Sequence, residues 1–307
     1  MAETSHTRCL FLAGPTAIGK SEIALRLAEQ HGGEIISADS MQVYRGLDIG
    51  TAKPSPAERS RVPHHLLDIC ELHETFDAAQ FIRRAQVAAT EIQGRGRLPI
   101  FCGGTGLYFK AFLSGLGEAP ATNPDLRTEL EAMPFETLLH ELRDRDPAAY
   151  EQIDKQNPRR VIRAVEVIRL TGKPFSAQRA EWKSAPEPHA PKNFFCLSRQ
   201  AADLHARIND RVDTMFQRGL VAETEQLLQH GLAENKNAMQ AIGYRQVVEH
   251  LNGERSLPET IEFVKLRTRQ FAKRQLTWFH RHAHAQWLEL PPDDGLEKTV
   301  QTIAEAI

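Results

Sequence analysis

The chain has 307 residues, of which 41% are apolar and 25% are charged. This composition excludes an intrinsically disordered or fibrous protein and is typical of a folded globular one. The 38 basic and 40 acidic side chains leave a formal net charge of −2, which carries no overall signature of nucleic-acid binding.

No apolar run approaches the roughly 18 residues that a membrane helix needs. The apolar run at residues 9–13 is followed at once by Gly14-Pro15 and is too short for the core of a signal peptide. The four cysteines lie far apart without a Cys-x-x-Cys pair, which argues against a disulfide framework and a structural zinc site. We therefore expect a cytoplasmic protein with no membrane partner.

The first third of the chain alternates short apolar stretches with amphipathic ones. The apolar stretches predict strands at residues 8–13, 34–37 and 98–102. Helical spacing of apolar residues predicts helices at 20–31 and 77–93, and Asp77 is placed to cap the second helix. Such alternation is typical of a parallel sheet that is covered by helices on both faces.

A change in composition follows residue 117. Residues 118–151 are rich in acids and contain no convincing strand, whereas residues 156–184 are rich in bases. The proline-rich stretch 185–191 predicts a connector, and strands are expected at 193–197 and 286–290 in an otherwise helical remainder. We therefore predict a mostly helical insertion domain at 118–190, within a core made of residues 1–117 and 191–307.

The complete motif G-x-x-x-x-G-K-[ST] lies between the first predicted strand and the first predicted helix. Its residues, called the phosphate loop below, are Gly14, Pro15, Thr16, Ala17, Ile18, Gly19, Lys20 and Ser21. Backbone N–H groups of such a loop wrap around phosphate oxygens, and the following helix adds the positive end of its dipole. Lys20 supplies a cation, and the Ser21 hydroxyl can ligate Mg²⁺.

The phosphate loop refines the fold class to α/β, with a P-loop NTPase-like parallel sheet core and a mostly helical insertion domain. It does not identify the reaction. An NTPase, a small-molecule kinase and a transferase that acts on a pyrophosphate all remain open.

Two more loops are predicted at the carboxyl edge of the sheet, where open α/β sheets bind ligands. Asp39 follows the second strand, and Thr105 lies in the glycine-rich turn after the third. A carboxylate here can accept a proton or hold a metal-bound water, although a turn aspartate is an equal alternative. The best Walker B candidate, residues 64–68, has histidines in two apolar positions, and no N-K-x-D motif is present. Routine NTP hydrolysis is therefore disfavoured.

A basic segment opens a predicted helix in the insertion. Val161, Val165 and Ile168 share one face of this helix, whereas Arg159 and Arg163 project together elsewhere. The segment predicts either a solvated helix face or a surface for RNA phosphates.

A second basic segment, residues 263–282, contains six bases and no acid. Lys265, Arg269 and Lys273 form a stripe at i, i+4 and i+8 of a predicted helix. Three apolar residues recur every seven positions and can face the core, namely Val264, Phe271 and Trp278. The same two interpretations remain open for this segment.

Taken in order, these segments resemble the bacterial tRNA dimethylallyltransferases, also called tRNA isopentenyltransferases. The resemblance runs from Leu10 to about Leu290. Besides the phosphate loop it rests on Asp39-Ser40-Met41-Gln42-x-Tyr44-Arg45-Gly46, Asp48-Ile49-Gly50-Thr51-Ala52-Lys53-Pro54, His65-Leu66-Leu67-Asp68, Gly103-Gly104-Thr105-Gly106-Leu107-Tyr108, Arg160-x-x-Arg163-Ala164-x-Glu166, Gly243-Tyr244-Arg245-Gln246 and Lys273-Arg274-Gln275-x-Thr277-Trp278. Many proteins share the phosphate loop, but not this ordered set.

The resemblance implies Mg²⁺-dependent transfer of a dimethylallyl group from dimethylallyl diphosphate to N6 of adenosine 37, beside the tRNA anticodon. It implies that the phosphate loop and Arg211 bind the diphosphate, with Mg²⁺ at Ser21. Asp39 is the implied general base, and Thr105 is the implied threonine where donor and adenine meet. The implied tRNA contacts are Asp39, Ser40, Met41, Gln42, Thr105, Arg159, Arg160, Val161, Ile162, Arg163, Gln240, Ala241, Ile242, Gly243, Tyr244, Arg245, Lys273, Arg274, Gln275, Leu276, Thr277, Trp278, Phe279 and His280. A monomer is expected.

Two alternatives compete with this interpretation. One is a metabolite kinase that uses the insertion as a lid and the arginines of residues 159–163 as phosphate clamps. The other is an RNA-binding module gated by a nucleotide, which the weak Walker B candidate disfavours.

Overall fold

The structure is a computed structural model of the chain and describes residues 9–116, 120–178, 193–291 and 295–307. It divides into two compact units, Met1–Leu113 with His189–Ile307, and Ser114–Pro188. The predicted domain boundaries at 117/118 and 190/191 fall outside the described residues, as does the whole of the predicted connector at 185–191.

The first unit, called the core unit below, is built on a six-stranded sheet of order β3-β2-β4-β1-β5-β6, in which every neighbouring pair is parallel. The strands are β1 (Leu10–Ala13), β2 (Gly33–Ala38), β3 (His64–His65), β4 (Leu98–Gly103), β5 (Phe194–Ser198) and β6 (Gln286–Glu289). Five of these strands were predicted to within a few residues, and the short edge strand β3 was not. The predicted α/β fold class is confirmed.

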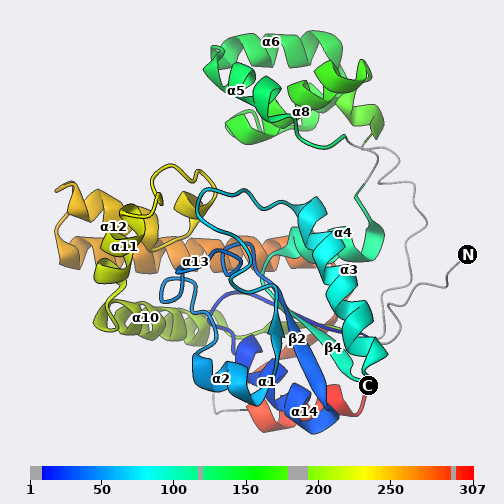
Figure 1. Cartoon of the computed structure of the whole chain (residues 1–307), viewed down its shortest axis with the longest axis vertical. Coiled ribbons are helices and arrows are strands. Elements are labelled where there is room, and N and C mark those ends of the chain that lie inside the picture. Colours follow the sequence, from blue (N-terminus) through cyan, green and yellow to red (C-terminus); the bar gives the residue numbers. More distant parts are fainter. Residues whose placement is uncertain (1–8, 117–119, 179–192, 292–294) are drawn as a thin grey trace, which may run out of the picture. The chain divides into compact units, whose positions relative to one another are not determined.

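Helices cover both faces of this sheet (Figure 1). Those of the core unit are α1 (Lys20–His31), α2 (Pro56–Arg61), α3 (Ala78–Gly94), α4 (Gly106–Ser114), α10 (Ala201–Gln217), α11 (Leu220–Leu228), the 3₁₀ turn η2 (Ala238–Gln240), α12 (Tyr244–Leu251), α13 (Leu257–His282) and α14 (Leu296–Ala304). The predicted cap of α3 is confirmed, because the Asp77 side chain accepts a hydrogen bond from the Gln80 N–H.

Alternation along β1 explains why helices are needed on both sides. Phe11 and Ala13 pack with α3 and α4 in one apolar cluster, whereas Leu10 and Leu12 pack with α1, α10 and α14 in another. All four side chains are fully buried or nearly so. A strand buried on both faces reads as a continuous apolar run, which is how this sheet was recognised in the sequence.

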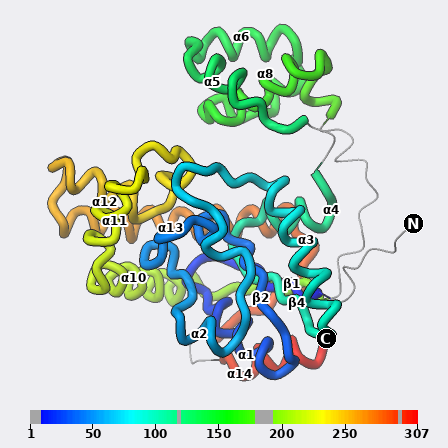
Figure 2. The backbone as a smooth tube through the Cα atoms, viewed as in Figure 1, coloured from blue at the N-terminus to red at the C-terminus, as the bar shows by residue number. Residues whose placement is uncertain are grey.

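The sheet register brings three loops to one edge. Gly103 at the end of β4 pairs with Ala13 at the end of β1 and with Ala38 at the end of β2. The loops that follow these three strands therefore leave the sheet side by side. These loops contain the phosphate loop, Asp39 and Thr105. Figure 2 labels the three strands, β1, β2 and β4, from which they leave.

The second unit, called the insertion unit below, contains helices and no strand in its described residues. Its helices are α5 (Pro124–Ala132), α6 (Phe135–Arg145), α7 (Pro147–Gln152) and α8 (Pro158–Thr171). They pack around an apolar cluster that includes Leu130, Leu142 and Val165. Glu166 of α8 is fully buried and accepts hydrogen bonds from the Asn123 N–H at 2.9 Å and from Arg163 at 2.7 Å.

Candidate active site

The phosphate loop joins β1 to α1 in the geometry that its sequence requires. Gly19 caps α1 with a φ of 108°, a left-handed backbone conformation that residues other than glycine rarely adopt. Lys20 Nζ donates a hydrogen bond to the Pro15 carbonyl at 2.6 Å. Burial lowers the pKa of the Lys20 ammonium to about 8, and the nearby Arg211 guanidinium contributes in the same direction. An anion beside Lys20 would relieve both effects.

Two arginines that the sequence analysis missed hold the outer side of the phosphate loop. Arg199 donates from Nε to the Ile18 carbonyl at 3.1 Å, and Arg207 donates from Nε to the Ala17 carbonyl at 3.1 Å. The next N–H points the opposite way in a trans peptide. Because the Ala17 and Ile18 carbonyls point toward these arginines, the N–H groups of Ile18 and Gly19 point away from them.

Asp39 is placed by its own backbone. Its Oδ1 accepts hydrogen bonds from the N–H groups of Met41 at 2.8 Å and Gln42 at 3.3 Å. Its Oδ2 accepts none from the described residues. The turn role and the chemical role therefore coexist, because one carboxylate oxygen fixes the side chain while the other remains open to a ligand.

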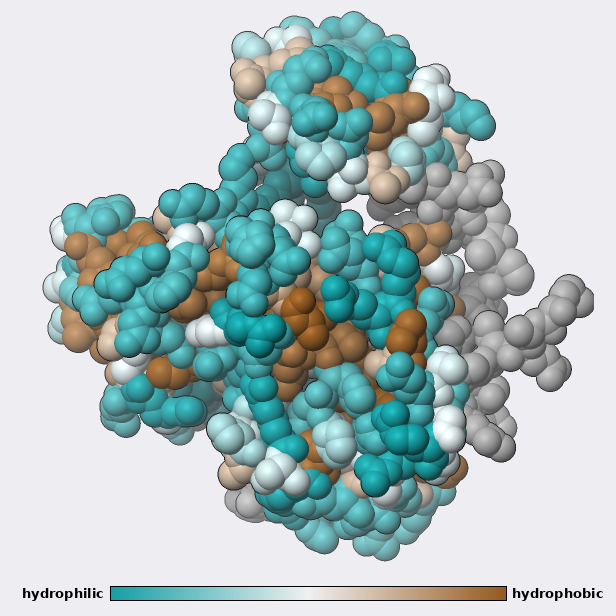
Figure 3. Space-filling view, in the orientation of Figure 1, coloured by the Kyte–Doolittle hydropathy of each residue, from teal (hydrophilic) through white to brown (hydrophobic). Residues whose placement is uncertain are grey.

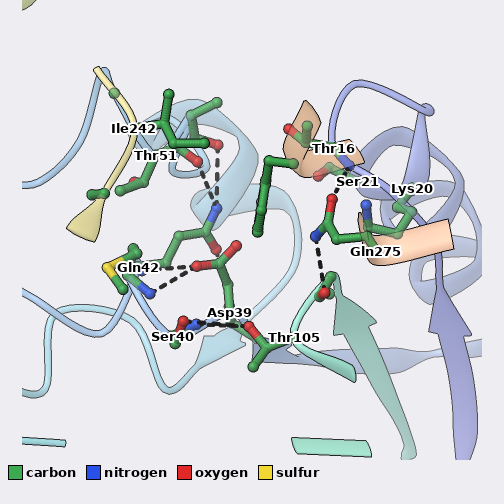
Figure 4. A pocket seen from close by; sticks show the side chains of 18 of the residues that line it. Thr16, Lys20, Ser21, Asp39, Ser40, Gln42, Thr51, Thr105, Ile242 and Gln275 are labelled. Atoms are coloured by element: carbon green, nitrogen blue, oxygen red, sulfur yellow. Dashed lines mark hydrogen bonds between the residues drawn. The ribbon is translucent and has the colours of Figure 1, made fainter. Parts of the chain in front are cut away.

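Thr105 lies directly beside this turn (Figure 4). Its N–H donates to the Ala38 carbonyl at 3.1 Å, and its hydroxyl accepts from the Ser40 N–H at 3.1 Å. The ends of β2 and β4 are thus joined at the residues predicted to meet the adenine.

Gln42 anchors the Asp39 turn to a second loop. Its Nε2 donates to the Thr51 and Ala52 carbonyls at 3.1 and 3.4 Å, and its Oε1 accepts from Ser37 Oγ at 2.9 Å. Lys53, with a side chain only 1% exposed, then holds this loop through Asp48 and Asp68 at 2.6 and 2.7 Å. Asp68 was the Walker B candidate, and its ion pairs commit it to this structural role.

The three loops, the loop at residues 50–54, α10 and α13 line a cavity of about 400 Å³. Charged and hydroxyl groups line part of it, including Lys20, Ser21, Asp39, Thr105 and Arg211, and apolar side chains such as Met41, Met215 and Ile242 line the rest. Arg211 has no hydrogen bond or ion pair with any described residue, and burial lowers its pKa. A guanidinium stays charged in proteins, so Arg211 is a cation available to a ligand.

Cys102 also lines the cavity, and burial raises the pKa of its thiol to about 11. It is therefore a neutral thiol near pH 7, unsuited to act as a nucleophile. The cavity thus combines a phosphate loop, the cations Lys20, Arg211 and Arg274, and a carboxylate with an apolar wall.

A comparison with known proteins gives the family of this chain. The model of the family described as IPP transferase matches residues 42–282. A tRNA dimethylallyltransferase 1 of Trichlorobacter lovleyi is 48% identical over 94% of this chain and 95% of its own length. The chain belongs to the IPP transferase family.

Other similar proteins match nearly the whole of this chain. The tRNA dimethylallyltransferase of Geobacter sulfurreducens is 46% identical over 94% of this chain and 93% of its own. The crystal structure of the tRNA isopentenylpyrophosphate transferase of Bacillus halodurans has a TM-score of 0.70 at 39% identity, covering 98% of this chain and 96% of the other. A eukaryotic dimethylallyltransferase, described as acting on tRNA, has a TM-score of 0.77 at 28% identity, covering 97% of this chain and 76% of the other.

The tRNA contacts that the family resemblance implies in the insertion unit differ in exposure. Arg159 and Arg160 are exposed at the start of α8. Arg163 is partly buried and is engaged with Glu166 and with the Pro120 carbonyl. Val161 and Ile162 are buried in the apolar cluster of the unit, so their side chains are not offered to RNA.

The segment Gln240–Arg245 shows the same division. Gln240 and Arg245 are exposed, Ile242 lines the cavity, and Ala241 and Gly243 are buried. Tyr244 is fully buried, and its hydroxyl donates to Glu223 at 2.6 Å and accepts from the Gly50 N–H at 3.1 Å. Its role is to hold the loop at Gly50, and burial raises the pKa of its hydroxyl.

On α13 the exposed members of the implied contact set are Lys273, Arg274, Thr277 and His280. Leu276 and Trp278 are half-buried. Phe279 and Gln275 are buried.

The predicted stripe lies on one helix, α13, but neither a solvated face nor an RNA surface describes Lys265 and Arg269. Lys265 pairs with Asp213 of α10 at 2.8 Å and with Glu262, and Arg269 donates to Asn209 Oδ1 at 2.6 Å. These contacts join α13 to α10, which runs beside it (Figure 1). Lys273 alone of the stripe lies exposed beyond this contact.

The predicted apolar seam of α13 is partly wrong. Val264 is buried and Trp278 is half-buried, but Phe271 is 38% exposed. The helical period is right, because Phe271 lies on the side that meets the cavity. On this side of α13 the Phe271 side chain is exposed to solvent, whereas Val264 is buried in the core unit.

No helix in the described residues is long and apolar enough to span a membrane. The face of the molecule drawn in Figure 3 is largely hydrophilic, with apolar side chains in small groups. Among the described residues, no cluster of three or more His, Cys, Asp and Glu side chains could hold a metal ion.

Proposed function

We propose that this IPP transferase family member transfers a dimethylallyl group from dimethylallyl diphosphate to N6 of adenosine 37 in tRNA, and releases diphosphate. The observation that carries the proposal is that one cavity is lined by Lys20, Arg211 and Asp39 together with apolar side chains. A kinase would also need the phosphate loop and could use the carboxylate as its base, but an apolar wall does not follow from phosphoryl transfer.

The donor fits this cavity by its two chemical halves. The diphosphate is an anion for the phosphate-loop amides, Lys20 and Arg211, and the five-carbon tail is apolar surface for the wall formed by Met215 and its neighbours. Binding would also restore full charge to Lys20, because a neighbouring anion favours the protonated amine.

The transfer needs a base, because the lone pair of the adenine amino group is delocalised into the ring. The N6 nitrogen forms a bond to the allylic carbon as the bond from that carbon to the diphosphate oxygen breaks, and the N6 proton passes to Asp39 Oδ2. The bonding electrons leave with the diphosphate, whose growing charge is met by Lys20, Arg211 and the loop amides. Asp39 is positioned for this because its Oδ1 is held by two backbone amides.

We infer that Mg²⁺ would bind this site together with the diphosphate of the substrate. Mg²⁺ is commonly bound by one or two protein oxygens together with substrate phosphates, and the Ser21 hydroxyl lines the cavity beside the phosphate loop. Bound there, Mg²⁺ would neutralise charge on the diphosphate.

We further propose that the adenine is extruded from the anticodon loop to reach Asp39, and that exposed cations bind the RNA backbone. The exposed cations among the implied contacts are Arg159, Arg160, Arg245, Lys273 and Arg274. We expect a cytoplasmic monomer, which cell fractionation and light scattering of the purified chain would test.

Isotope transfer tests the proposed function. The protein is incubated with unmodified tRNA, Mg²⁺ and either dimethylallyl diphosphate labelled in the isoprenoid or ATP labelled in the γ-phosphate. Label from the isoprenoid is expected in tRNA, at one adenosine. Label arriving only from ATP would establish a kinase, and tight RNA binding without either product would establish a binding module.

A further inference from the structure

Gln275 connects two of the loops that form the cavity. It lies on α13 and is 8% exposed. Its Oε1 accepts a hydrogen bond from the Thr16 N–H of the phosphate loop at 2.9 Å, and its Nε2 donates to the Gly104 carbonyl at 2.9 Å. Figure 4 shows the amide between the phosphate loop and the end of β4.

Both contacts depend on the fold. Thr16 and Gly104 lie 259 and 171 residues before Gln275 in the sequence. They are neighbours because β1 and β4 pair side by side, with Ala13 opposite Gly103. A single side chain from α13 therefore spans the gap between two loops that leave adjacent strands.

Gly104 makes room for the Gln275 amide. A Cβ atom at this position would lie 2.2 Å from Gln275 Nε2 and 3.3 Å from the Gly14 carbonyl oxygen. Any larger residue at position 104 must therefore displace the amide of Gln275. A carboxamide is also specifically suited to the site, since it offers an acceptor to Thr16 and a donor to Gly104 at once.

The surroundings separate Gln275 from the RNA-facing side of α13. Lys273, Arg274 and Thr277 are exposed, whereas Gln275 has its polar atoms committed to backbone groups inside the core unit. Both polar atoms of the Gln275 amide hold backbone groups of the core unit, which gives this side chain a structural task that the exposed residues of α13 do not have.

We propose that Gln275 is a positioning residue that sets the distance between the diphosphate-binding loop and the Thr105 loop, and that it does not contact tRNA. The proposal rests on the proposed function, because it assigns the diphosphate to the phosphate loop. Loss of the amide would loosen the loop that meets the donor and the loop that meets the adenine, while the exposed cations of α13 stay in place.

The variant Gln275→Met tests this, because methionine has nearly the same length and removes both hydrogen bonds. Each such bond contributes modestly to stability. We expect the Kd for inorganic diphosphate with Mg²⁺ and the KM for dimethylallyl diphosphate each to rise on the order of tenfold. The Kd for tRNA should stay within about twofold. Gln270→Met is the matched control, since Gln270 is exposed on the same helix, and it should change none of these values.

A double-mutant cycle with Gly104→Ala gives an independent test. The added methyl displaces the Gln275 amide, so Gly104→Ala should reproduce the rise in diphosphate Kd. The double variant, Gly104→Ala with Gln275→Met, should have a diphosphate Kd close to that of each single variant. Melting temperatures of all variants check that the comparison concerns folded protein.

Unchanged diphosphate affinity in Gln275→Met, fully additive effects in the cycle, or a loss confined to tRNA affinity would each overturn the proposal. Failure of the wild-type protein to transfer a dimethylallyl group would refute the proposed function instead. The inorganic diphosphate titration would still decide the role of Gln275.

Discussion

The cavity and the outer face of α13 both present cations, but in opposite surroundings. Lys20 and Arg211 lie in a cavity with partly apolar walls, where burial lowers both pKa values, and the loops beside them are fixed by internal hydrogen bonds. Lys273 stands exposed on the helix surface, outside the cavity. Buried, pre-positioned charges suit one small anion and a chemical step, whereas exposed ones suit a long phosphate backbone and respond to salt.

The carboxylate in the cavity should show the largest effect. Asp39→Asn keeps an oxygen for the Met41 and Gln42 amides but cannot take a proton. Turnover should fall by about 10² to 10⁴, the usual contribution of a general base, with tRNA affinity near that of the wild type. Single-turnover kinetics and filter binding measure the two quantities. Asp210→Asn, on an exposed part of α10, is the control, and unchanged turnover in Asp39→Asn would remove Asp39 as the base.

The lowered pKa of Lys20 predicts that binding of the donor depends on pH. Its pKa of about 8 in the free protein means that the ammonium is lost as pH rises through 8, so diphosphate binding must then recover a proton. The Kd for dimethylallyl diphosphate should rise by up to about tenfold per pH unit above 8, in a range where the phosphates are already ionised. Calorimetry across this range gives the profile.

Lys20→Arg should flatten this profile, because a guanidinium keeps its charge. Lys298→Arg, at an exposed position of α14, should leave the profile as in the wild type. The same steep profile in Lys20→Arg would show that another group titrates.

The exposed cations should show the smallest and most uniform effect. Lys273→Ala should weaken tRNA binding and reduce the magnitude of the salt slope of log K by about 1, because one phosphate contact is lost. Turnover at saturating tRNA should change little. Binding measured over a series of salt concentrations, with Lys298→Ala as the control, tests this, and an unaltered slope would mean that Lys273 touches no phosphate.

The sequence predicted those parts of the site that depend on short, contiguous segments of the chain. The phosphate loop is a contiguous motif, and Asp39 follows a recognisable strand. Their convergence at one sheet edge follows from the parallel topology, which alternation of strands and helices already indicated. Thr105 was placed near Asp39 for the same reason, and the register of β2 and β4 brings them together.

The parts that the sequence did not predict depend on contacts between distant segments. Arg199 and Arg207 support the phosphate loop from about 180 to 190 residues away, and no local signal marks them. Lys265 and Arg269 belong to a basic stripe in the sequence, but their partners on α10 are invisible to a periodicity argument. Tyr244, an implied RNA contact, is buried and bound to Glu223, so a residue of a family motif can serve packing in place of binding.

The most direct measurement is a structure of the protein with an anticodon stem-loop and a non-transferable analogue of dimethylallyl diphosphate that has sulfur in place of the bridging oxygen. We predict the diphosphate on residues 14–21, its tail along the apolar wall, and adenine N6 within about 2.6 to 3.2 Å of Asp39 Oδ2. A diphosphate bound elsewhere, or an adenine that stays outside the cavity, would contradict the account.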